Sequence, residues 1–113
     1  MSDARPLPSF RDAREDYVED HVMHDLAKKM IGDVLGAVRR TAELVDLGPD
    51  QSAELIGTVT AVLLVALSAV MRRKFKITDR EAHTVMMREL PQIIENLQND
   101  KTFLNDVNAF IGD

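Results

Sequence analysis

Residues 55–71 read LIGTVTAVLLVALSAVM, an uncharged stretch of seventeen residues that decides the fold of this chain. In a helix drawn through it, apolar side chains occur all round and not along one stripe. Such a helix has to be covered on every side. It is therefore the central helix of a bundle, a core helix that a second copy also covers in a homodimer, or a membrane span. We favour the two soluble interpretations, because seventeen residues is at the lower edge of spanning length.

Capping and helix-breaking residues predict the bounds of two long helices, one before this stretch and one that contains it. Ser9 and Asp12 resemble a capping box, so the first helix is expected to run from there to about Leu47, before a Gly-Pro break. Asp50 is the expected N-cap of the apolar helix, which continues to about Phe75.

The third helix has the strongest start signal in the sequence. Thr78 and Glu81 form a capping box, and the apolar pattern continues to about Leu97. Pro91 lies inside this pattern without shifting the apolar face. We expect a kinked continuous helix, or two helices nearly in line with Pro91 in the first turn of the second.

A short fourth helix completes the predicted fold. Asn99 or Asp100 can cap it, and it extends to about Ile111. The sequence therefore predicts an all-α, compact bundle of about four helices, with a long first helix, an apolar central second, a Pro-kinked third and a short fourth. Residues 1–8 are expected to be a flexible tail, and residues 9–113 a single helical domain.

Composition restricts the classes of function. The chain has 113 residues, 45% of them apolar, a net charge of −5 and no cysteine. Disulfides, zinc–thiolate sites and cysteine nucleophiles are thereby excluded. The negative charge argues against nucleic acid as a partner. The first twenty residues carry acidic residues and prolines and no apolar run, so we expect no secretory signal and a cytoplasmic protein.

The start of the first helix carries an acidic segment. Met23, Met30 and Val38 belong to a broad apolar face, but the same angular sector further back is acidic. Carboxylates are not buried unpaired, so the helix either overhangs the bundle there or bends near Asp20, which would cap a new helix. The segment is a solvated overhang or an arm that docks a basic partner. Its candidate residues are Asp12, Glu15, Asp16, Glu19 and Asp20.

A basic cluster follows the apolar stretch. These cations complement the negative end of the helix dipole, or form a docking patch for an acidic partner, including the acidic segment of a neighbouring subunit. The last alternative predicts self-association that depends on salt. The cluster comprises Arg72, Arg73, Lys74 and Lys76.

Small residues and methionines raise two further packing questions. Gly57, Ala61 and Ser68 lie close together on the helical wheel, which indicates tight packing within the chain or a seam of self-association. Met86 and Met87 are neighbours 100° apart, so one of them is expected at an edge or an interface.

Three histidines raise the question of a metal site. His21 and His24 share a helix face, and His83 could approach from the third helix. Neither the Glu-x-x-His pattern of di-metal bundles nor a His-Glu-x-x-His motif is present, so we expect surface histidines and no bound metal or cofactor.

The sequence therefore favours a non-enzymatic protein-interaction module, an adaptor, inhibitor or regulatory subunit that self-associates as a homodimer. Nucleophile and phosphate-binding motifs are missing, whereas two charged segments and surplus apolar surface remain. The alternatives are a metal-binding helical protein that uses His21, His24 and His83, and a small membrane-associated protein.

Overall fold

The chain folds into four α-helices and two short 3-10 helices in the computed structural model, which describes residues 6–112. In chain order the elements are η1 (Arg11–Ala13), α1 (Asp20–Glu43), η2 (Pro49–Gln51), α2 (Ala53–Phe75), α3 (Asp79–Gln98) and α4 (Lys101–Ile111). No strand occurs between residues 6 and 112, which confirms the all-α bundle of four helices. The first five residues of the expected tail lie outside the described range.

The cap signals of α3 and α4 are confirmed. The Glu81 backbone N–H donates to Thr78 Oγ1 (3.1 Å), and the Thr78 backbone N–H donates to Glu81 Oε1 (2.9 Å). At the start of α4, Asp100 Oδ1 accepts from the Thr102 backbone N–H (2.9 Å). Helix α3 is continuous through Pro91, so one helix forms here and not two in line, and the expected kink stays a prediction.

The first helix is shorter at both ends than its sequence predicts. Ser9 and Asp12 do exchange hydrogen bonds, but these support only η1, and the chain is not α-helical again until Asp20. The alternative in which the chain bends near Asp20 is therefore correct, and the continuous helix from Ser9 is wrong. Helix α1 ends at Glu43, and Asp46 adopts a left-handed conformation (φ 62°) that reverses the chain.

Helix α2 begins slightly later than expected. Asp50 lies in η2, and Ser52 is the N-cap of α2. The Ser52 side chain is buried, and its Oγ donates to the Gly48 carbonyl oxygen (2.9 Å), which satisfies the hydroxyl away from water. At the other end, Lys76 is the C-cap of α2 and adopts a left-handed conformation (φ 53°). The chain turns there, and α3 follows.

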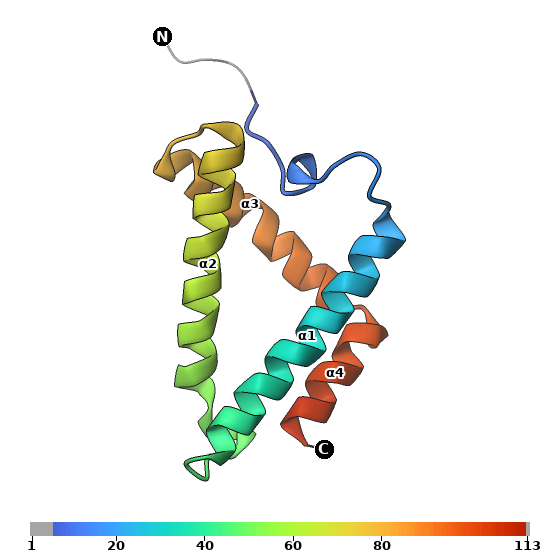
Figure 1. Cartoon of the computed structure of the whole chain (residues 1–113), viewed down its shortest axis with the longest axis vertical. Coiled ribbons are helices and arrows are strands. Elements are labelled where there is room, and N and C mark those ends of the chain that lie inside the picture. Colours follow the sequence, from blue (N-terminus) through green and yellow to red (C-terminus); the bar gives the residue numbers. More distant parts are fainter. Residues whose placement is uncertain (1–5, 113) are drawn as a thin grey trace.

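The four helices form an open arrangement. In Figure 1, α1 and α2 diverge from the loop that joins them, and α3 runs from the far end of α2 across to α1, so the three resemble the sides of a triangle. Helix α4 lies alongside α1, α3 packs on α2, and α3 also contacts α4. The principal extents of 55 × 29 × 21 Å describe a flat, elongated particle.

Few apolar side chains are buried in this arrangement. Met71, Ala82 and Val85 form the core between α2 and α3, and Leu7 and Phe10 of the N-terminal segment pack against it. Four further buried apolar residues belong to α1 and α4, which pack on each other: Val38, Ala42, Phe103 and Phe110.

Candidate interaction surfaces

The apolar helix α2 lies largely at the surface. In its most apolar 18-residue window, 6% of the residues are buried. Val62, Leu63 and Val70 are among its exposed side chains, and Val65 is 69% exposed. The expectation that the other three helices cover α2 is therefore wrong for the single chain, because α1 and α4 pack on each other and leave α3 as the main neighbour of α2.

Two of the three small residues of α2 are also exposed. A methyl group added at Gly57 would meet no atom within 4 Å, and Ala61 is exposed. Ser68 is half-buried, and its Oγ lies 3.4 Å from Asp79 Oδ1. Tight packing within the chain, one of the two interpretations of these residues, is therefore wrong at Gly57 and Ala61.

An apolar groove of about 580 Å³ lies inside the triangle of helices. All four helices contribute to its walls, and nearly every lining side chain is aliphatic or aromatic. Its walls include Met30 and Val34 of α1, Leu63 of α2, Ile94 of α3 and Phe103 of α4. No local sequence pattern predicts this groove, because its shape depends on the angles between helices.

A second groove of about 520 Å³ runs between α2 and α3 on the basic end of α2. Val65 and Arg72 line one wall, and Arg80 and Met87 line the other. Met87 is 61% exposed whereas its neighbour Met86 is buried, as expected from their positions on the wheel.

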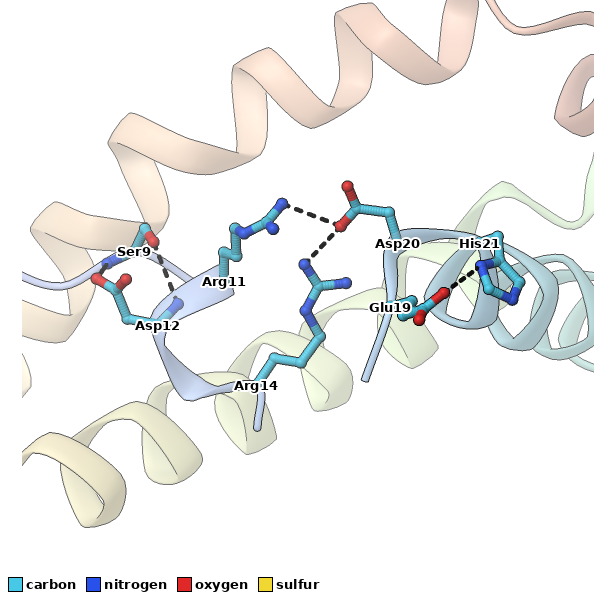
Figure 2. A network of polar contacts seen from close by, with 7 residues as sticks. All are labelled: Ser9, Arg11, Asp12, Arg14, Glu19, Asp20 and His21. Atoms are coloured by element: carbon cyan, nitrogen blue, oxygen red, sulfur yellow. Dashed lines mark hydrogen bonds and ion pairs between the residues drawn. The ribbon is translucent and has the colours of Figure 1, made fainter. Parts of the chain in front are cut away.

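The acidic segment is a folded connection with its own ion pairs (Figure 2). Arg11 and Arg14 converge on Asp20, at 3.0 Å and 2.6 Å from its Oδ1. The hydrogen bond from Arg14 and the positive charge of Arg11 lower the pKa of the Asp20 carboxyl below its ordinary value. Glu19 pairs instead with His21, at 3.2 Å from its Nδ1.

The remaining acidic candidates are divided between two places. Asp12 closes the turn at Ser9, and Glu15 Oε1 lies 3.9 Å from Lys74 Nζ. Asp16 is exposed. The acidic segment and the basic cluster therefore meet within one chain, at Glu15 and Lys74.

The basic cluster is spread around the end of α2. Arg72 Nε lies 3.7 Å from Asp79 Oδ1, across the turn to α3. Arg73 and Lys76 are exposed, and both belong to the region where cations complement the carboxyl end of α2.

The three histidines lie in different surroundings. His21 pairs with Glu19, His24 stacks edge-on against Phe103 with ring centroids 4.8 Å apart, and His83 lines the groove between α2 and α3. Residues 6–112 contain no group of three or more His, Asp or Glu side chains placed to hold a metal ion. The metal-binding alternative therefore has no site in the described part of the chain.

Comparison of the chain with protein-family models, with curated proteins and with solved structures found no match. The inference about function therefore depends on the surfaces described above.

Proposed function

We propose that this chain is a non-enzymatic protein-interaction module that self-associates by burying α2 between copies. The observation that carries the proposal is the exposure of α2, a helix with an uncharged stretch of seventeen residues, of which 6% is buried in its most apolar window. Each large aliphatic side chain moved from water into an interface contributes about 1.5–3 kcal/mol. Contiguous apolar surface of this kind marks an interaction site in a soluble protein.

The surroundings of α2 support the same proposal. The exposed side chains of α2 lie beside two grooves, of about 580 and 520 Å³. A docking helix would therefore contact the residues that line these grooves as well as α2 itself. The sequence also lacks a nucleophile or phosphate-binding motif, which favours binding over catalysis. A cytoplasmic adaptor, inhibitor or regulatory subunit is the class that fits these features.

Light scattering coupled to size exclusion tests this proposal directly. We expect the purified chain to elute in detergent-free buffer as a dimer of twice 12.7 kDa at micromolar concentration and above. Replacing Val62 and Val65 by Ser should shift it toward the monomer, whereas the same change at Ile111, an exposed residue of α4, is the matched control. A particle that stays monomeric throughout would remove the proposal.

Membrane association is the second candidate, because α2 is also long and apolar enough to cross a bilayer. Its 23 residues span roughly 35 Å, against a hydrocarbon thickness of about 30 Å. Flotation with lipid vesicles separates the two candidates. Recovery of the chain in the vesicle fraction, with aggregation in detergent-free buffer, would favour the membrane, whereas a soluble dimer that stays below the vesicles would exclude it.

A further inference from the structure

We propose that two copies pair along α2 in antiparallel orientation, about a two-fold axis that crosses the helix pair midway between Ala61 and Val65, with Glu54 of each copy against Arg72 of the other. This inference rests on the proposed function, because it specifies which face of α2 self-association buries. Two observations support it: the positions of the charged residues along one exposed face of α2, and the groove beside that face.

One exposed face of α2 has the spacing of a two-helix seam. Its residues recur alternately four and three positions apart, as the contact positions of paired helices do. The face lies beside the one that packs on α3, and all but half-buried Ser68 are exposed. The seam residues are Glu54, Thr58, Ala61, Val65, Ser68 and Arg72.

The antiparallel orientation follows from the two ends of this seam. Glu54 and Arg72 are both nine residues from Leu63, so a two-fold axis at that height along the helix places opposite charges together at each end of the pair. A parallel pair would place Glu54 against Glu54 and Arg72 against Arg72, and like charges opposite one another oppose association. Charge complementarity therefore selects a second copy, reversed in direction.

The middle of the seam fits the same register. Ala61 would oppose Val65 of the partner subunit, and Thr58 would oppose Ser68, because each pair is equidistant from Leu63. These small side chains let two helices approach closely, and the open space at Gly57 leaves the approach unobstructed.

The groove between α2 and α3 receives the acidic end of the partner helix. Arg72 and Arg80 line it together with Asp79, so the pocket offers two guanidinium groups to an incoming Glu54. Arg72 Nε already lies 3.7 Å from Asp79, but a guanidinium carries five N–H donors and can serve both carboxylates. Met87 extends the same wall with exposed apolar surface.

A charge-reversal cycle tests the pairing. Glu54→Arg alone and Arg72→Glu alone should each weaken the dimer by on the order of tenfold or more, because each creates two like-charge contacts across the two-fold axis. The double variant Glu54→Arg with Arg72→Glu should recover most of the affinity. Arg73→Glu, the same charge change one residue away and off the seam, is the matched control. Dissociation constants from sedimentation equilibrium in low salt give the comparison, and a double variant no tighter than the singles would overturn the pairing.

Disulfide trapping tests the register independently of affinity. The native chain has no cysteine, so each introduced thiol reports alone. Chains carrying Ala61→Cys mixed with chains carrying Val65→Cys should cross-link to each other faster than either does to itself. Homodisulfides of the Ala61→Cys chain that form at least as fast would contradict the antiparallel register. A dimer that persists while the cycle and the cross-link both fail would defeat this pairing alone, and a chain that is monomeric throughout would remove the proposed function as well.

Discussion

Met71 is the largest of the fully buried side chains, at 1% exposed, and its neighbour Val70 on the same helix is 55% exposed. Replacing Met71 by Ala leaves a cavity against Ala82 and Val85, so we expect a loss of about 2–5 kcal/mol in the free energy of unfolding. Val70→Ala removes a comparable apolar group from the surface and should change that free energy by less than about 0.5 kcal/mol. Urea unfolding of both variants makes the comparison, and equal losses would contradict this assignment of the core.

Asp20 gives a prediction about pH. Its pKa is lowered by the Arg14 hydrogen bond and the Arg11 charge, so the folded chain holds this carboxylate ionised more strongly than the unfolded chain does. Its stabilising contribution is therefore present above the ordinary Asp pKa, about 3.9, and is lost as pH falls through the lower folded value. NMR titration of the carboxyl carbon should place Asp20 below the ordinary value. Arg14→Ala should raise its pKa, whereas Arg40→Ala on the exposed side of α1 should leave it unchanged.

At the residue scale, sequence reasoning found the acidic candidates but missed what they contact. Arg11 and Arg14 lie among these carboxylates and were not singled out, although an arginine near an acidic group is a readable signal of a local ion pair. The contact between Glu15 and Lys74 joins segments far apart in the chain, and no local pattern could place it.

The best-predicted feature among the elements is the start of α3. Because Thr78 accepts the Glu81 N–H, Thr78→Ala leaves that donor without its side-chain partner and should reduce the free energy of unfolding by about 1 kcal/mol. Thr78→Ser keeps the acceptor and should restore most of that loss. Thr84→Ala removes a hydroxyl from the interior of the same helix, where it only bonds back to the Arg80 carbonyl. Thermal unfolding that ranks Thr84→Ala as more damaging than Thr78→Ala would contradict the cap.

The other element boundaries show which signals are local. Caps depend on residues two or three positions apart, so those at Thr78 and Asp100 could be predicted from the sequence. The start of α1 was not fixed in this way, because the Ser9–Asp12 pair makes the same contacts around a turn that does not continue as a helix. Sequence reasoning did name a bend near Asp20, since acidic side chains there could not face the core. The helix N-cap is Glu19, one residue earlier.

At the scale of the whole molecule, the sequence predicted four helices correctly and the covering of α2 incorrectly. The uncharged stretch predicts that α2 is buried against other helices, but it does not predict which helices bury it. In the structure α4 packs on α1, and little of the chain remains to cover α2. The apolar surface of α2 that stays exposed is an argument for a second chain. Helical periodicity alone could not predict this exposure, because it depends on how the helices pack.

The small core predicts that folding and association are coupled. Met71, Ala82 and Val85 are the only members of the buried α2–α3 cluster in the described chain, so the isolated copy is expected to be weakly stable. For a folded dimer that unfolds to monomers, each tenfold rise in protein concentration stabilises the dimer by about 1.4 kcal/mol. The midpoint of thermal unfolding should therefore rise with concentration between 1 and 100 μM, roughly. A midpoint that does not move would indicate that the single chain is stable alone.

The left-handed turn at Lys76 has a consequence for biosynthesis. It folds α3 back along α2, so α2 acquires its main neighbour only after α3 has left the ribosome. Until then the most apolar segment of the chain is exposed to water, and much of it stays exposed afterwards. We expect nascent and unpaired copies to be bound by chaperones and degraded faster than assembled ones, so that the cellular half-life of the protein lengthens as its own expression rises.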